Sequence, residues 1–113
     1  MIETANWTEN RIFDIGLLEL FLTKKNPKVS VKIPYPLIGT GIAFNAAKPD
    51  PRISILMKVN NVPIFQIIPF LIGNNRTWDF DLALIFSIGQ EICFEGRNLK
   101  SKLRIILKYH KAS

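Results

Sequence analysis

The sequence predicts an all-β fold, an antiparallel β-sandwich of about eight short strands. Apolar and polar residues alternate with a period of two in several segments along the chain. Clusters rich in glycine, proline and asparagine separate these segments at regular intervals, as expected for a sandwich or a barrel. A chain of 113 residues has the usual length of one domain. We therefore expect residues 1–10 to form an N-terminal arm and residues 11–113 a single β-sandwich domain.

The individual strands are predicted from this alternation. Residues 10–25 fit either a strand pair bent at Gly16 or a helix with one apolar stripe, and the β-rich remainder of the chain favours strand. Asn60 and Asn61 suit a two-residue hairpin turn between two strands. Loops are expected at the turn clusters 34–41 and 45–51. The clearest alternating segments are residues 28–33, 52–59, 77–84, 90–96 and 102–110.

Residues 62–70 form the most apolar segment of the chain, and it contains Pro63 and Pro69. Proline cannot donate a hydrogen bond to a β-ladder, so this strand is expected at a sheet edge or at a bulge. An apolar edge strand aggregates unless it is covered. We therefore predict a homo-oligomer, with a trimer favoured, and an interface formed by Ile64, Phe65, Ile67, Ile68 and Phe70.

The net charge of +6 comes entirely from the C-terminal end of the chain. Residues 1–95 contain nine basic and nine acidic residues, whereas residues 96–113 contain six basic residues and no acidic one. Such asymmetry favours an acidic partner. A protein surface is favoured over nucleic acid, because single-strand binders add aromatic stacking platforms that this face lacks. The predicted partner-binding residues are Lys100, Lys102, Arg104 and Lys108.

Asp79 and Asp81 are the only pair of carboxylates that alternation places side by side on a strand. They lack the oxygen-rich, glycine-containing loop typical of a calcium site. We interpret them as the solvated side of a half-buried strand whose core face is Trp78, Phe80, Leu82 and Leu84.

Enzymatic activity is not expected. The chain has one histidine, His110, and one cysteine, Cys93, which are too few for a catalytic triad or a typical zinc site. We predict no catalytic, cofactor-binding or metal-binding residue, and a buried, inert Cys93. A small ligand-binding β module remains the alternative function. It would bind nucleic acid through the basic C-terminal strand, or carbohydrate through the loop 33–41 with Tyr35, with Trp7 and Trp78 as further candidates.

Residues 77–112 resemble the last hairpin of small jelly-roll modules in capsid-decoration (cement) and tail proteins of tailed phages. The resemblance lies in a strand followed by "SIGQEICFEG", a short polar loop and the closing strand "LRIILKYHKA". It implies a jelly-roll-like, non-enzymatic structural protein that self-associates in a ring and decorates a capsid or tail surface. The partners would be further copies and the major capsid or tail protein. The polar N-terminus and the absence of a long apolar run fit a virion protein assembled in the host cytoplasm, not secreted and not membrane-bound.

Overall fold

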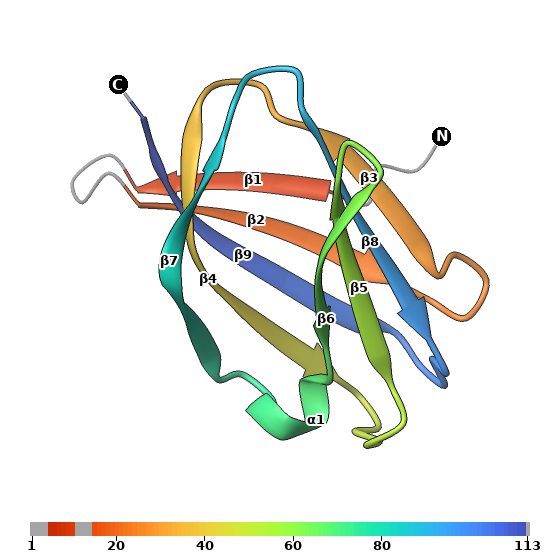
Figure 1. The fold of residues 1–113 in the computed structure, drawn as a ribbon. Helices are drawn as coiled ribbons and strands as arrows, with labels where there is room; N and C mark the ends of the chain where they lie inside the picture. The colour runs from red at the N-terminus through yellow and green to blue at the C-terminus, as the bar shows by residue number, and fades with distance from the viewer. Residues whose placement is uncertain (1–4, 11–14, 113) are drawn as a thin grey trace.

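The computed structural model describes residues 5–10 and 15–112, and it consists of two β-sheets packed face to face (Figure 1). The one helix of this described part, α1, is far too short to cross a membrane. The elements in chain order are β1 (Ala5–Asn10), β2 (Ile15–Leu22), β3 (Lys28–Lys32), β4 (Leu37–Ala46), β5 (Ser54–Val59), β6 (Val62–Ile67), α1 (Pro69–Ile72), β7 (Thr77–Phe86), β8 (Glu91–Arg97) and β9 (Leu103–Lys111).

The strand order is that of a jelly roll. The five-stranded sheet has the order β1-β2-β9-β4-β7, and the four-stranded sheet has the order β3-β8-β5-β6. The chain folds back on itself at the β5–β6 hairpin, so that β5 pairs with β6, β4 with β7, β3 with β8 and β2 with β9, all antiparallel. This nested pairing across two sheets is the double Greek key of the jelly roll, with β1 added beside β2. The predicted antiparallel β-sandwich is confirmed.

The core lies between the two sheets and is formed by the inward-facing residue of each alternating pair. In β2 and β9 the inward residues are almost completely buried. No polar or charged residue is buried among the residues that the structure describes. The fully buried large side chains are Tyr109, Phe44, Phe94, Leu18, Leu20, Leu22, Ile33, Leu37, Ile42, Ile55, Met57 and Ile92.

The N-terminal part of the chain adds a strand to its own sheet. Residues 5–10, the described part of the predicted arm, form β1 and pair with β2. Within residues 10–25, the strand alternative is correct for Ile15–Leu22. Gly16 lies inside β2, and a Cβ atom there would lie 2.0 Å from Cζ of Tyr109. Glycine is therefore required by the tyrosine ring packed over it, not by a bend.

The predicted loops over residues 34–41 and 45–51 are wrong for residues 37–41 and 45–46, which belong to β4 (Leu37–Ala46). This strand lies inside the five-stranded sheet, between β9 and β7. The two glycines that indicated a turn lie at a bulge, where Thr40 interrupts the register with both neighbouring strands. Glycine is common at bulges because its backbone adapts without a side chain to place.

The hairpin predicted at Asn60 and Asn61 is confirmed. Both residues have positive φ, 50° and 66°, as a type I′ turn requires. The following strand, β6, is an edge strand of the four-stranded sheet, as the prolines of residues 62–70 indicated. The predicted strand is too long, because β6 ends at Ile67 and residues 69–70 belong to α1. It is also bulged, because the register with β5 shifts between Met57 and Lys58 and leaves Ile64 without an opposite residue.

The prediction that Leu82 faces the core is wrong. Gly39 pairs with Leu84 and Gly41 with Asp79, so residues 80–83 of β7 lie opposite Thr40 alone. The extra length of β7 bends this stretch away from β4, and Leu82 is 81% exposed. We call residues 80–83 the β7 protrusion.

Candidate interaction surface

The exposed large apolar side chains of the described residues lie mainly on one side of the sandwich. β6 and β7 are the free edges of the two sheets on this side, and α1 joins them (Figure 1). We call this side, formed by β6, α1 and β7, the apolar edge. Its exposed apolar residues are Val62, Ile64, Ile68, Phe70, Leu71, Leu82 and Ile85, followed by Ile88 in the next turn, whereas Ile15 on β2 is the one member located elsewhere.

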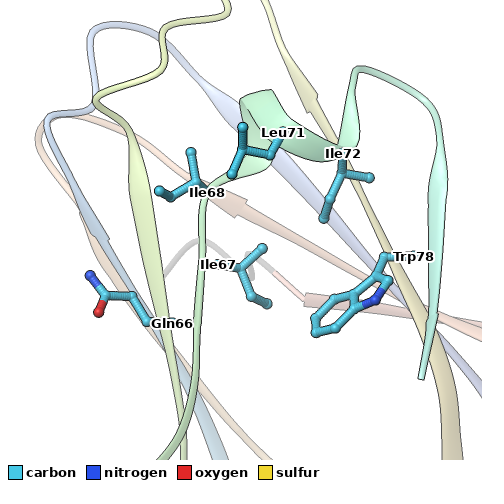
Figure 2. A pocket seen from close by; sticks show the side chains of 6 residues that line it. All are labelled: Gln66, Ile67, Ile68, Leu71, Ile72 and Trp78. Carbon is cyan, nitrogen blue, oxygen red and sulfur yellow. The ribbon is translucent and has the colours of Figure 1, made fainter. Parts of the chain in front are cut away.

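A groove opens on the apolar edge between the end of β6, α1 and the start of β7. Its volume is about 210 Å³. Figure 2 shows Ile67 and Trp78 pointing toward each other across its floor, with α1 above them. Such a shape with apolar walls binds apolar groups because their transfer from water is favourable. The lining residues are Gln66, Ile67, Ile68, Leu71, Ile72 and Trp78.

Three aromatic rings close the core beneath this groove. Phe65 of β6 stacks on Phe80 of β7 with ring centroids 5.7 Å apart, and Trp78 meets both rings edge to face at 5.6 and 5.5 Å. These contacts connect the free edges of the two sheets, and each such pair adds to the stability gained by burial. The apolar edge is thus held in a fixed shape.

The residues predicted as an oligomer interface divide into two groups. Ile64, Ile68 and Phe70 are exposed at 38%, 36% and 50%. Phe65 and Ile67 point inward, Phe65 into the aromatic cluster and Ile67 into the core at 5% exposure. The alternation of β6 places these two residues on the inner face of the four-stranded sheet, a position that an all-apolar sequence does not reveal.

Charged side chains lie beside the groove and on the β7 protrusion. Asp79 and Asp81 are exposed, in agreement with their interpretation as the solvated side of a strand. Arg76 lies in the turn between α1 and β7, and its Cδ atom is 3.3 Å from the position that a Cβ of Gly73 would occupy. Within residues 5–10 and 15–112, none of these three side chains forms an ion pair. The charges are therefore available to a partner.

Arg104 and Lys108 of β9 lie on the outer face of the five-stranded sheet, Lys102 directly precedes this strand, and the charges of Lys102 and Arg104 are engaged within the chain. The guanidinium of Arg104 forms an ion pair with Glu19 on the neighbouring β2. The ammonium of Lys102 lies 4.1 Å from the centre of the Phe21 ring, within the range of a cation–π contact. Lys108 is half-buried in the middle of the face. The four predicted residues thus do not form one continuous charged stripe.

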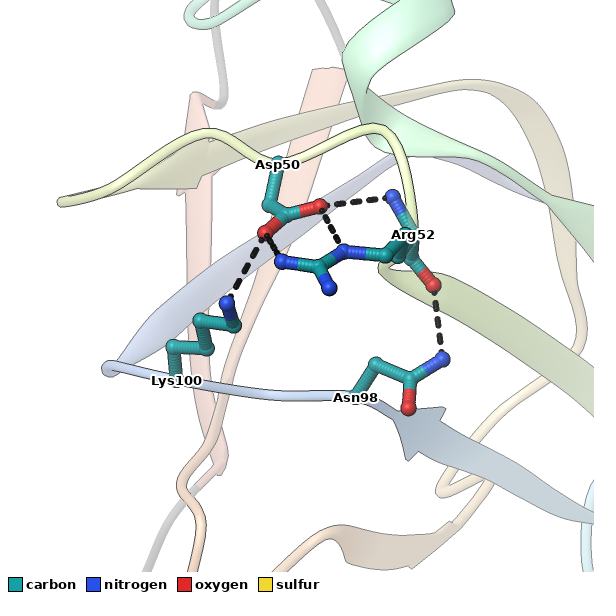
Figure 3. Close-up of polar contacts among 4 residues, drawn as sticks. All are labelled: Asp50, Arg52, Asn98 and Lys100. Atoms are coloured by element: carbon teal, nitrogen blue, oxygen red, sulfur yellow. Dashed lines mark hydrogen bonds and ion pairs between the residues drawn. The ribbon is translucent and has the colours of Figure 1, made fainter.

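Lys100 belongs to a separate polar cluster that connects two loops at one end of the sandwich (Figure 3). Its ammonium lies 3.3 Å from Asp50, which also binds the guanidinium of Arg52 at 2.9 Å. Asn98 donates a hydrogen bond to the carbonyl of Arg52. The hydrogen bonds from Arg52 hold the pKa of Asp50 well below its usual range. This cluster joins the β4–β5 loop to the β8–β9 loop.

Two of the three aromatic residues considered for carbohydrate binding, Trp7 and Tyr35, pack against each other and Tyr109 at the other end of the sheet, whereas Trp78 lies at the groove. The Tyr35 hydroxyl donates to Glu9 and shares a 2.7 Å hydrogen bond with the Tyr109 hydroxyl. Trp7 meets the Tyr109 ring edge to face at 5.5 Å. Burial, together with the hydrogen bond to Glu9, raises the pKa of Tyr35 far above its usual value. Lys111 lies 4.4 Å from the centre of the Tyr35 ring. The polar and aromatic groups of this cluster therefore bind one another and fasten β1 to the body.

The described residues contain no group of three or more His, Cys, Asp or Glu side chains close enough to hold a metal ion. Cys93 is a buried free thiol, as predicted. No family model, curated protein or solved structure matches this chain.

Leu71, Leu82 and Arg76 are parts of this surface that were not identified from the sequence. The sequence did contain a signal for the exposure of Leu71, because Pro69 suits the first turn of a helix and Gly73 its end. A short helix there turns Phe70 and Leu71 outward. No local signal marks Leu82, because its exposure depends on the pairing between β7 and β4.

Proposed function

We propose that this chain is a non-enzymatic structural protein that self-associates through its apolar edge. The observation that carries the proposal is the concentration of exposed apolar side chains on β6, α1 and β7, at the free edges of both sheets. A large exposed apolar patch on a small domain marks an interaction site. An interface of standard size buries about 800 Å² on each partner. That is roughly a ninth of the 7112 Å² surface of this chain, so one side of the sandwich is sufficient.

The opposite side of the sandwich supports the same proposal by contrast. The edge strand β3 and the turn before it carry exposed lysines, namely Lys24, Lys25, Lys28 and Lys32. Charged side chains, lysine above all, protect a sheet edge from pairing with other chains. The β3 edge is therefore protected, whereas the exposed side chains of the apolar edge favour association with a further copy.

Light scattering of the purified chain over a range of concentrations tests this proposal. We expect a fixed oligomer, with three times the subunit mass of 12.9 kDa favoured. The double variant Phe70→Ser/Leu71→Ser removes two exposed apolar side chains from α1 and is expected to weaken the oligomer. Ile15→Ser is the matched control, because Ile15 is also an exposed apolar residue but lies on β2. A monomer at all concentrations would overturn the proposal.

The finer form of the proposal is that this oligomer decorates a virus particle, binding a capsid or tail protein. It is supported by the resemblance of residues 77–112 to phage decoration modules, and the jelly-roll topology agrees with it. Mass spectrometry of purified particles from a culture that produces the chain is the test. We expect the chain in many copies per particle. Finding it only in the particle-free fraction would contradict this form.

A further inference from the structure

Leu82 and the groove have the shapes of a projecting group and its receptor. Leu82 lies on the β7 protrusion and is 81% exposed, more than any other large apolar residue in the described ranges. The groove begins at Trp78, four residues earlier on the same strand, and continues to α1. Four residues of strand span about 13 Å at most. A projecting apolar group and an open apolar groove thus lie close together on the apolar edge.

The groove has the size for a leucine side chain. An apolar cavity of about 150 Å³ lined by leucine, isoleucine and phenylalanine holds benzene. The groove measures about 210 Å³, and the side chain of leucine has fewer carbon atoms than benzene. Leu82 does not fill the groove of its own chain, because it is exposed there. We take a second copy of this chain as the occupant of the groove, because every copy presents the same exposed Leu82.

The charges around the two features are complementary. Asp81 precedes Leu82 on the protrusion and is exposed. Arg76 lies between α1 and Trp78, and its aliphatic stem follows the end of α1 near Gly73. A neighbouring copy whose Leu82 enters the groove would bring its own Asp81 toward Arg76. Opposite charges at the rim of an apolar contact increase the association rate and fix the orientation of the partner.

We propose that Leu82 of one copy inserts into the groove between α1 and Trp78 of the next copy, with Asp81 pairing with Arg76 across the interface. This inference rests on the proposed self-association and identifies the contact that produces it. Insertion that runs in one direction, from each copy to the next, is heterologous and closes into a ring when the rotation permits. It therefore agrees with the trimer favoured for this chain.

A charge-swap cycle tests the contact. Asp81→Arg and Arg76→Asp are each expected to weaken the oligomer by about tenfold in low salt, and the double variant Asp81→Arg/Arg76→Asp is expected to restore it. Asp79→Arg/Arg76→Asp is the matched control. Asp79 is also exposed but pairs with Gly41 in the regular part of β7, so this combination is not expected to restore association.

Leu82→Ser tests the apolar part of the contact. We expect weakening by about tenfold or more, the effect of one leucine withdrawn from an apolar pocket. Circular dichroism checks that each variant remains folded. An oligomer that persists in Leu82→Ser, or a charge swap without restoration, overturns this inference but leaves the proposed function in place. A wild-type chain that is monomeric at all concentrations overturns both.

Discussion

Replacing Gly16 with alanine tests how closely β2 packs against the aromatic cluster at the end of the five-stranded sheet. The new Cβ would lie 2.0 Å from Cζ, 2.3 Å from Cε2 and 2.5 Å from the hydroxyl oxygen of Tyr109. Carbon atoms in contact are normally about 3.5–4.0 Å apart. The tyrosine ring must therefore move by more than 1 Å, on the order of the missing separation. It is 1% exposed and packed against Trp7, so no open space receives it.

The expected loss of stability follows from these contacts. Overpacking a core costs about 1–3 kcal/mol. Moving the Tyr109 hydroxyl also breaks its 2.7 Å hydrogen bond with Tyr35, which costs about 1 kcal/mol. Alanine also restricts the unfolded chain more than glycine does, and this raises the free energy of unfolding by about 0.5 kcal/mol. We expect Gly16→Ala to lower the free energy of unfolding by about 1.5–3.5 kcal/mol, a large part of the roughly 5–15 kcal/mol typical of a folded protein.

Urea unfolding followed by tryptophan fluorescence measures this loss, because Trp7 lies against Tyr109. Gly89→Ala is the control. No atom lies within 4 Å of the Cβ that this alanine would add. Only the positive φ of 85° disfavours the alanine, so the free energy of unfolding is expected to fall by about 1 kcal/mol. In a Tyr109→Leu background the clashing ring atoms are absent, and Gly16→Ala is expected to cost little. An equal cost in both backgrounds would show that the ring is not the cause.

Three further predictions concern the turn, the ion pairs and the tyrosine cluster. Asn60→Ala is expected to lower the free energy of unfolding by about 1–2 kcal/mol and so to lower the thermal midpoint, because Asn60 has a φ of 50° and its side chain accepts a hydrogen bond from the backbone of Glu91. Asn61→Gly is the control, because glycine keeps the turn and is expected to leave the thermal midpoint nearly unchanged. The hydrogen bond from Lys58 lowers the pKa of Glu95, so its contribution is present above pH ~4.3 and is lost as the pH falls through the lowered value. Glu95→Gln is therefore expected to destabilise at pH 7 and to match the wild type below that lowered value, and a pH-independent difference in urea midpoints would contradict this. Tyr35→Phe removes the hydroxyl that bonds both Glu9 and Tyr109 and is expected to cost about 2 kcal/mol in urea unfolding. The oligomer mass is expected to stay unchanged, because none of these residues belongs to β6, α1 or β7.

Local patterns in the sequence were sufficient for most of the strands. Alternation predicted β3, β5 and β9 because each has one face on the core and one more exposed face. It also predicted β8, in which Ile92, Cys93 and Phe94 are all buried. Asn60 and Asn61 predicted the hairpin because they adopt positive φ readily. The prolines of residues 62–70 predicted an edge strand, since proline cannot donate to a ladder, and β6 is one, although Pro69 begins α1. These features depend on residues close together in the chain.

The candidate surface was only partly predictable, because exposure depends on distant partners. The apolar residues of β6 indicated an interface, but alternation within the folded sheet turns Phe65 and Ile67 inward. Leu82 was assigned to the core by its spacing, and the uneven pairing with β4 turns it outward. Likewise, the charge of Arg104 is partly neutralised by Glu19, which is 85 positions away in the sequence.

The sequence by itself determined an all-β sandwich, its tight hairpin and a surplus of apolar surface, because periodicity, turn chemistry and composition act over a few residues. The tertiary structure alone decided that Leu37–Ala46 is a strand, since its glycines favour turns locally and were accommodated in the sheet by a bulge at Thr40. It also decided which apolar residues remain exposed and where the groove opens. Those properties are fixed when strands far apart in the chain pair, and no local pattern carries that information.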